Sequence, residues 1–173
     1  MATTFLILSD THDDAFPGPA SLPSKVDVVI YCGDLTMIGG LSNYKKFIDV
    51  SLDRKWWQDN LIEEEDDPEE PAQALADGRT FTIYASPYAP EFNGYVFAYG
   101  PDEDRFGPGA EHPISEGVDI VMTHGSPLLP SQDYVLDVNR QGNHCGCPIL
   151  YDAIYQARPK LHCFGHIHEG YGV

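Results

Sequence analysis

Four short apolar runs in this chain each end abruptly in an aspartate or a histidine, and this feature most constrains its fold. The runs cover residues 5–8, 26–32, 120–123 and 161–164. Short β-rich runs bounded by turn residues are typical of buried strands, so the polar residues fall where strands give way to loops. Open α/β sheets bind ligands at that edge. The sequence therefore predicts an α/β fold with a site at the strand ends, formed by Asp10, His12, Asp34, His124, His166 and His168.

The rest of the sequence alternates strand-like and helix-like segments without an internal repeat. Helical spacing of apolar residues predicts a helix over about 41–61, and a second helix is expected over 149–157, just after Pro148. Strands are expected at 80–85 and 95–99, and exposed connections at 63–70 and 101–113. With 173 residues, of which 42% are hydrophobic, we expect a single domain over residues 1–173.

The charge of the chain limits its partners. A net charge of −17 with only 10 Lys and Arg residues opposes binding to a nucleic acid polymer. A small phosphorylated substrate is compatible, because bound cations would reverse the sign of the local field. No apolar stretch reaches the roughly 20 residues that span a bilayer, and the chain begins on a strand rather than a signal peptide. We expect no membrane partner and a cytoplasmic location.

The four cysteines do not indicate a disulfide framework. Cys32 and Cys163 lie inside strand patterns, where reduced thiols simply pack. Cys145 and Cys147 could form a metal-binding pair, although no second pair exists to complete a thiolate site. The acidic run at 63–70 is interpreted as a solvated loop, with a Ca²⁺ site as the alternative.

The six strand-end residues have the composition of a two-metal site. Two divalent ions about 3.5–4 Å apart need a shared oxygen ligand, and we assign this bridge to Asp34. Mixed histidine and carboxylate ligation favours Mn²⁺, with Fe or Zn²⁺ possible, over Ca²⁺ and Mg²⁺. A water between the ions loses a proton near neutral pH and becomes an in-line nucleophile on phosphorus. The other ligands divide by position, Asp10, His12 and His168 at one ion and His124 and His166 at the other.

At these residues the chain resembles the calcineurin-like metallophosphoesterases, whose signature blocks are Asp-x-His, Gly-Asp, Gly-Asn-His, Thr-His-Gly and Gly-His-x-His. It is most similar to the small branch containing the metallophosphoesterase-domain proteins of animal brain and their fungal relatives. The resemblance implies a four-layer α/β/β/α sandwich, a dinuclear metal site, and hydrolysis of phosphomonoesters or phosphodiesters, including cyclic nucleotides in some members. The matching blocks, in the family's order, are Asp10-Thr11-His12, Gly33-Asp34, Thr123-His124-Gly125 and Gly165-His166-Ile167-His168.

One family block is absent from its expected place. Between Asp34 and His124 the family carries Gly-Asn-His, whose asparagine ligates the second metal and whose histidine protonates or stabilises the leaving oxygen. Here a segment of roughly two dozen residues, with one core strand, is missing by comparison with the family pattern. We therefore expect a shortened sandwich and a weaker second metal site. The chain also stops five residues after His168, and an uncovered sheet edge makes a homo-oligomer possible.

A literal Gly142-Asn143-His144 does occur, but it follows His124 and so lies at the wrong place in the topology. We interpret it as a chance match and keep His144 as a candidate catalytic residue beside Asp34 and His124. No residues are assigned to an organic cofactor. Two functions are compatible with these patterns: a metal-dependent phosphoesterase acting on a small phosphorylated substrate, or a catalytically impaired or repurposed metal-binding relative that acts as a sensor, as a scaffold or on non-phosphate chemistry.

Overall fold

The computed structural model describes residues 2–14, 26–37, 39–43, 45, 72–75, 77–91, 94, 97–129, 131 and 134–170. The chain divides into two compact units, which we call unit 1 (Met1–Glu69) and unit 2 (Glu70–Val173). Of the helix predicted over 41–61, residues 41–43 and 45 are helical, and the rest lies outside the described residues, as does the acidic run at 63–70. A single domain over 1–173 stays a prediction.

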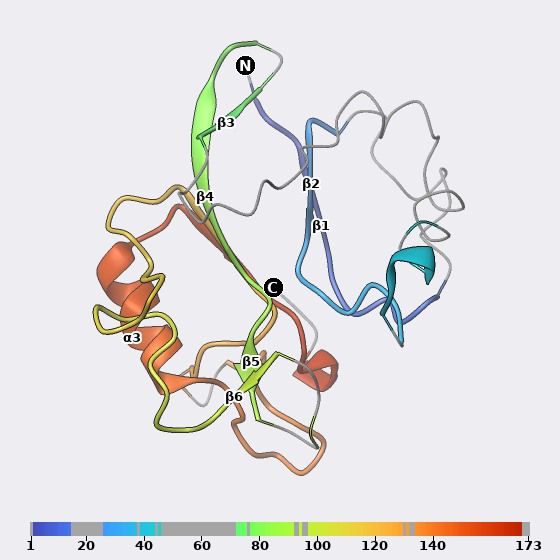
Figure 1. The fold of residues 1–173 in the computed structure, drawn as a ribbon, viewed down its shortest axis with the longest axis vertical. Coiled ribbons are helices and arrows are strands. Elements are labelled where there is room, and N and C mark those ends of the chain that lie inside the picture. Colours follow the sequence, from blue (N-terminus) through green and yellow to red (C-terminus); the bar gives the residue numbers. More distant parts are fainter. Residues whose placement is uncertain are drawn as a thin grey trace. The chain divides into compact units, whose positions relative to one another are not determined.

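Unit 1 contains a pair of parallel strands. The strands β1 (Phe5–Leu8) and β2 (Val28–Tyr31) are paired in register from Phe5↔Val28 to Leu8↔Tyr31 (Figure 1). The predicted run at 5–8 is confirmed, and that at 26–32 is a shorter strand. Because the strands are parallel, their carboxyl ends meet at one edge, so the loop after β1 lies beside the loop after β2.

Unit 2 is built on a four-stranded sheet in the order β3-β4-β7-β8. Its strand β3 (Ala72–Ala74) is antiparallel to β4 (Thr80–Ser86), whereas β4, β7 (Ile120–Thr123) and β8 (Leu161–Cys163) are mutually parallel. These three strands match the predicted ones to within one residue at each end. A separate parallel pair is formed by β5 (Ala89–Pro90) and β6 (Ala98–Tyr99).

One face of the unit 2 sheet is covered by α3 (Pro148–Ala157), as Figure 1 shows. The helix begins where the sequence predicts it, because Pro148 lacks the N–H that a first turn leaves unpaired and the Cys147 thiol accepts a bond from the Leu150 N–H at 3.3 Å. Its buried face packs against β4 and β7. The core comprises Tyr84, Tyr99, Phe106, Val118, Val121, Cys147, Leu150, Ala153 and Ala157.

The segment 101–113 is not the uniformly exposed connection that its composition predicts. Phe106 is only 1% exposed and packs edge-to-face on Tyr99, with ring centroids 5.6 Å apart. Asp104 causes this inward turn, since its Oδ1 accepts bonds from the N–H groups of Phe106 and Gly107 at 3.1 and 2.6 Å. The expectation was wrong because a single buried aromatic residue among turn formers gives no periodic signal.

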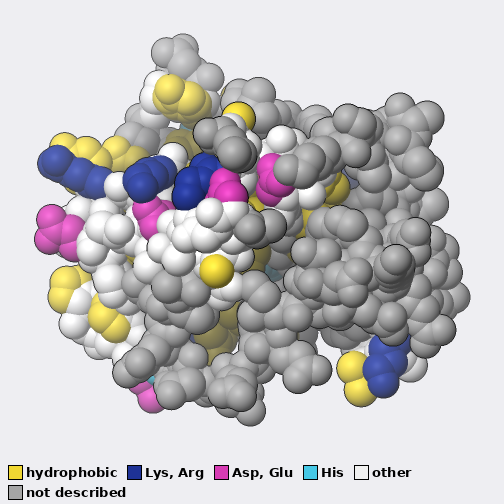
Figure 2. Space-filling view, turned by 90° about the horizontal axis from the view of Figure 1, so that it is seen from above, with side chains coloured by type: hydrophobic (Ala, Val, Ile, Leu, Met, Phe, Trp, Pro, Cys, Tyr) yellow, Lys and Arg dark blue, Asp and Glu magenta, His cyan; other side chains and the backbone are white. Residues whose placement is uncertain are grey.

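The described residues form a mixed α/β structure, as predicted, while the four-layer sandwich and the loss of one core strand stay predictions. On the face drawn in Figure 2, acidic and basic side chains lie close together among apolar ones. Within the described part of the chain, every helix is too short or too polar to traverse a lipid bilayer.

Candidate metal centre

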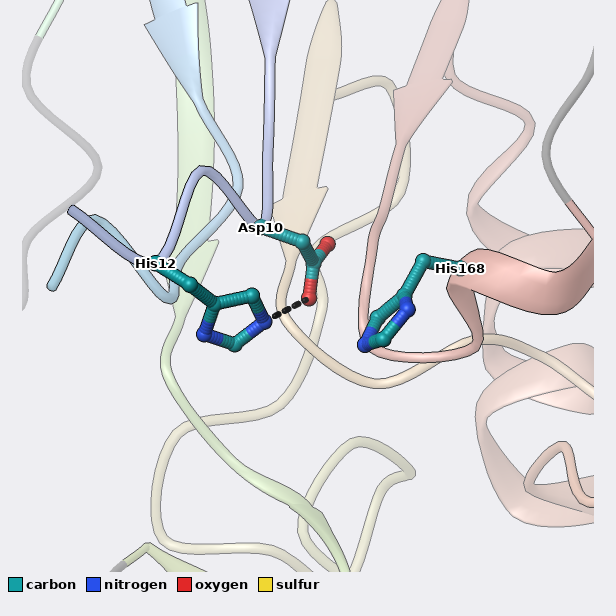
Figure 3. Close-up of side chains that lie close together, drawn as sticks. All are labelled: Asp10, His12 and His168. Carbon is teal, nitrogen blue, oxygen red and sulfur yellow. Dashed lines mark ion pairs between the residues drawn. The ribbon is translucent and has the colours of Figure 1, made fainter. Parts of the chain in front are cut away.

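In unit 1, the structure brings together three predicted ligands at the ends of β1 and β2. The Nε2 atom of His12 lies 3.9 Å from Oδ1 of Asp10 and 3.8 Å from Oδ2 of Asp34. Figure 3 shows Asp10 and His12 directed toward each other. Two atoms bound to one ion at 2.0–2.2 Å lie about 3 to 4.4 Å apart, depending on the angle between the bonds. The separations therefore suit ligands of a shared ion.

Hydrogen bonds between the two loops of unit 1 continue the pairing of β1 and β2. The N–H groups of Asp10 and His12 donate to the carbonyls of Gly33 and Asp34, each at 3.0 Å. Between these two ligands, the Thr11 N–H donates to the Tyr31 hydroxyl at 3.3 Å. Burial raises the pKa of Tyr31, so its hydroxyl remains protonated near neutral pH. These hydrogen bonds fix the loops that carry the ligands before a metal binds.

Four of the six predicted ligands have a left-handed backbone conformation. This conformation costs a non-glycine residue about 1–2 kcal/mol, and such strain clusters at functional sites because only an over-determined structure maintains it. The sequence pattern does not indicate this conformation, although aspartate and histidine tolerate it better than most residues. The four residues and their φ angles are Asp10 (53°), His12 (48°), Asp34 (53°) and His166 (73°), among seven non-glycine residues with positive φ in the described part of the chain.

In unit 2, the predicted ligands His124 and His166 are in contact. Their Nε2 and Nδ1 atoms lie 3.2 Å apart, and the rings meet nearly edge-to-face, at 71°. Two nitrogens bound to one ion at 2.0–2.1 Å in tetrahedral geometry lie about 3.3 Å apart. The pair therefore has the spacing of two imidazoles that share an ion.

The backbone around His124 is fixed on both sides. Its N–H donates to the Ser86 carbonyl and its carbonyl accepts from the Gly165 N–H, each at 3.0 Å. These bonds join the end of β4 to the loops that follow β7 and β8. Parallel strand ends thus deliver His124 and His166 to the same edge of the sheet, as the strand-end pattern predicts.

A buried histidine, His162, contacts the residue before His124 and is not a candidate ligand. The Thr123 hydroxyl donates to the Gly125 carbonyl at 2.7 Å, so it accepts from Nε2 of His162 at 3.0 Å. Burial lowers the pKa of His162 to about 4, which keeps its ring neutral near pH 7. His162 is therefore structural, and Thr123 is a supporting residue whose role the sequence pattern does not indicate.

The two remaining candidates, His168 and His144, also belong to unit 2. His168 begins the short 3₁₀ helix η2 (His168–Gly170), and its side chain is drawn in Figure 3. His144 is bonded through Nδ1 to Oδ1 of Asp137 at 2.8 Å rather than to either ring of the His124–His166 pair. Asp137 is a second residue that the sequence analysis missed. Side chains with ligand atoms suited to a metal include Asp10, His12 and Asp34 in unit 1 and His124 and His168 in unit 2.

The described cysteines are free thiols with separate environments. Cys32, Cys147 and Cys163 are buried, as the strand patterns predict for the first and the third. Cys147 caps α3, whereas the Cys145 sulfur accepts a bond from the Asn139 side-chain amide at 3.2 Å. The two members of the Cys-x-Cys pair therefore serve different local structures.

No family model matches the chain. Human metallophosphoesterase domain-containing protein 1 is 29% identical over 211 residues, which cover 99% of this chain and 62% of that protein. The chain is similar to the metallophosphoesterase-domain proteins. The predicted resemblance to this branch is thereby confirmed. A UPF0046 protein of Caenorhabditis elegans is 35% identical over 92 residues, which cover 53% of this chain and 22% of that protein.

The chain spans 62% of the length of the human metallophosphoesterase-domain protein. It also matches a probable rhamnogalacturonate lyase C of Emericella nidulans, with 28% identity over 95% of this chain and 17% of that protein. The human alignment runs over 211 residues, whereas this chain has 173, so at least 38 of those positions (211 less 173) have no counterpart here. An internal shortening is compatible with this difference, and its position between Asp34 and His124 stays a prediction.

Proposed function

We propose that this chain is a divalent-metal-dependent phosphoesterase that hydrolyses a small phosphodiester or phosphomonoester, with cyclic nucleotides as candidate substrates. The metallophosphoesterase-domain relatives support the reaction class. The observation that carries the proposal is the 3.2 Å contact between His124 and His166 at the edge of parallel strands. Two imidazoles at ligand spacing, on loops that follow neighbouring parallel strands, have the placement that a shared metal ion needs.

The donor set fits the metals that we propose. Imidazole nitrogens together with carboxylate oxygens suit Mn²⁺ first, and Fe or Zn²⁺ as alternatives. Asp34 has two carboxylate oxygens and is our candidate for the bridging ligand. When bound, such ions lower the pKa of a coordinated water toward neutrality and withdraw charge from phosphoryl oxygens. The residues proposed to hold two ions are Asp10, His12, Asp34, His124, His166 and His168.

The protein's own contribution is to hold these ligands in place. The backbone bonds at Asp10 and His12, and those on both sides of His124, fix the ligand positions before any metal arrives. Such preorganisation avoids reordering the site during the reaction. We place His124 near the leaving side of the substrate and Asp34 at the centre. The ion held by His124 and His166 should bind more weakly, because Asp34 is the only carboxylate proposed for it.

The acidity of the chain fits a small substrate better than a polymer. With 27 acidic and 10 basic residues, the protein would repel an extended polyanion, whereas bound cations would attract one phosphoryl group locally. We therefore propose a small phosphorylated substrate and no nucleic acid polymer. The absence of a membrane partner and the cytoplasmic location stay predictions.

A second candidate function rests on the length difference from the human relative. At least 38 aligned positions lack a counterpart here, and if they include the Gly-Asn-His block, a ligand and the acid histidine are lost. The protein would then be a catalytically impaired or repurposed metal-binding member of the branch. Metal binding without turnover is the signature of this alternative.

One experiment separates the two functions. The full chain would be stripped with a chelator, loaded with Mn²⁺ and offered bis-p-nitrophenyl phosphate and 2′,3′-cyclic nucleotides, beside a His166→Ala variant. We expect hydrolysis by the natural chain and a large loss in the variant. Equal, background-level rates in both would overturn the phosphoesterase proposal, and the metal content measured on the same samples would then establish or exclude the alternative.

Self-association is a further proposal, made because β3 and β8 are the two outer strands of the described unit 2 sheet. Unpaired strand edges tend to pair with other chains unless they are covered. Sedimentation velocity at micromolar concentration tests it, and a purely monomeric profile would contradict it.

A further inference from the structure

Asp137 is a fully buried carboxylate in unit 2, with 0% of its side chain exposed. Burying a carboxylate is costly unless each oxygen is paired. Both oxygens of Asp137 are: Oδ1 lies 2.8 Å from Nδ1 of His144, and Oδ2 accepts from the Leu129 N–H at 3.2 Å. Its backbone carbonyl accepts from the Cys145 N–H at 2.8 Å. The carboxylate therefore has two partners, one of them a histidine, and a third hydrogen bond holds the backbone of the same residue.

This pairing fixes which nitrogen of His144 is available for chemistry. An ionised carboxylate only accepts hydrogen bonds, so Nδ1 must carry a proton. The opposite ring atom, Nε2, is then the position that gains or loses a proton, as in any imidazole oriented by a carboxylate. The His144 side chain is one-third exposed, so Nε2 can be reached from solvent.

The loop that carries the Asp137–His144 pair is attached to both segments that carry metal-ligand candidates in unit 2. Leu129, which donates to Asp137, lies in the loop that begins with His124. At η2, Arg140 pairs with Glu169, the neighbour of His168, at 3.3 Å. The two backbones also touch there, because a Cβ on Gly170 would lie 2.1 Å from the Val135 carbonyl oxygen. The pair thus belongs to the same end of the unit as the predicted site.

We propose that His144, oriented by Asp137, donates the proton that the leaving group needs when a phosphoester is hydrolysed. This inference rests on the proposed function. In the step, the oxygen of the attacking water bonds to phosphorus as the bond from phosphorus to the leaving oxygen breaks. That oxygen takes the proton from Nε2 of His144 and departs as an alcohol. The attacking water releases its proton to solvent, and His144 regains one from solvent. Asp137 is a positioning residue, and His144 is the catalytic residue.

The position of His144 in the sequence suggests a chance match to the family motif, but its surroundings in the fold do not. His144 stands in a Gly-Asn-His tripeptide that is displaced from the family's order, yet its side chain has the buried partner that an acid–base histidine requires. General acid catalysis of this kind contributes about 10²–10⁴ in rate. The contribution is largest for poor leaving groups, because a good leaving group departs without a proton.

The test compares two symmetric diesters whose leaving groups differ in acidity, diphenyl phosphate and bis-p-nitrophenyl phosphate, with the Mn²⁺-loaded full chain. In His144→Gln, we expect kcat/KM to fall by about 10²–10³ for the diphenyl ester and by less than about tenfold for the nitrophenyl ester, with metal content unchanged. His112→Gln, which changes an exposed histidine of the same unit, should alter neither. Equal losses on both esters, or no loss on either, would overturn the role of His144.

A spectroscopic readout tests the positioning role of Asp137 independently of activity. Nitrogen-15 chemical shifts of the neutral His144 ring should show the proton on Nδ1 in the natural chain, and a shift toward the Nε2-protonated form in Asp137→Asn. A natural chain with Nε2 protonated would overturn the positioning role. If Asp137→Asn fails to fold, the shift in the natural chain and the His144→Gln kinetics still decide the proposal. A natural chain inactive on both esters would instead overturn the proposed function, and this inference with it.

Discussion

The Nδ1 atom of His166 lies 3.2 Å from Nε2 of His124, although the two residues are 42 positions apart in the chain. Parallel pairing of β7 and β8 produces this contact, because each histidine follows the carboxyl end of its strand. The contact defines the part of the proposed metal centre that can be tested within unit 2 alone.

Replacing His166 by alanine should remove one ligand of the proposed ion. Loss of even an outer hydrogen-bond partner of a metal ligand costs 10–100-fold in affinity, so the loss of the ligand itself should cost more than about 100-fold. Equilibrium dialysis with Mn²⁺ measures this. The matched control is His112→Ala, which removes an exposed side chain and leaves the backbone carbonyl that accepts the Tyr84 hydroxyl at 3.0 Å. Unchanged Mn²⁺ affinity in His166→Ala would exclude His166 as a ligand.

Replacing Asp34 tests whether its backbone is strained. Its φ of 53° is unfavourable for residues with a Cβ and accessible to glycine. In metal-free protein, Asp34→Gly should therefore be more stable than Asp34→Ala by about 1 kcal/mol, while both lose metal affinity. Hydrogen exchange of the β1 amides in the presence of a chelator reports the stability of unit 1. An alanine variant as stable as the glycine variant would show that the residue is not strained.

The buried ring of His162 makes unit 2 sensitive to acid. Its pKa of about 4 in the folded state lies below the ordinary value of 6.5, so the unfolded chain binds the proton first as pH falls. The stabilisation is complete above about pH 6.5 and is lost progressively toward pH 4, by up to about 3 kcal/mol.

The matched variant for this prediction is His162→Gln, which retains an N–H for the Thr123 hydroxyl and cannot titrate. The free energy of unfolding should fall less steeply below pH 6.5 in the variant than in the natural chain. Urea titrations followed by the NMR signals of the β7 amides at pH 7 and pH 5 give the comparison. Parallel pH profiles for the two proteins would contradict a neutral, buried His162.

Gly146 allows a close approach of two backbone segments beside the α3 cap. A Cβ there would lie 2.1 Å from the Pro127 carbonyl oxygen, which no side-chain rearrangement can relieve. Gly146→Ala should destabilise unit 2 by about 1–3 kcal/mol or more. Gly100→Ala is the control, since nothing lies within 4 Å of its added Cβ and its φ is not in the left-handed region. Urea midpoints of the two variants should differ, and equal midpoints would count against this packing.

Much of the sheet could be predicted because its strands are short apolar runs with clear ends. The runs before Asp10, Asp34, His124 and His166 are all strands, since a buried parallel strand needs an apolar side chain on both faces. Phe106 could not be predicted, because the turn that buries it depends on the hydrogen bonds of Asp104 and not on periodicity. A strand was predicted over 95–99, and among the described residues of that range only Ala98 and Tyr99 form a strand, β6.

The identity of the candidate ligands followed from spacing and resemblance, but their backbone conformations did not. A left-handed aspartate at position 34 is a consequence of how the β2 loop is bonded to the β1 loop, which a linear sequence does not show. Asp137 was missed for a similar reason. Its seven-residue separation from His144 has no helical or strand period, so the pairing emerges only from the folded loop.

The burial of free thiols in both units has a practical consequence. Cys32 belongs to unit 1 and Cys147 and Cys163 belong to unit 2; all three are buried, and none is in a disulfide. A cysteine hidden in the native state reacts with an alkylating reagent only after its surroundings open. Peptide mass spectrometry over a time course of iodoacetamide treatment would therefore give the unfolding rate of each unit separately. Equal rates would indicate one cooperative unfolding event, and different rates would indicate two.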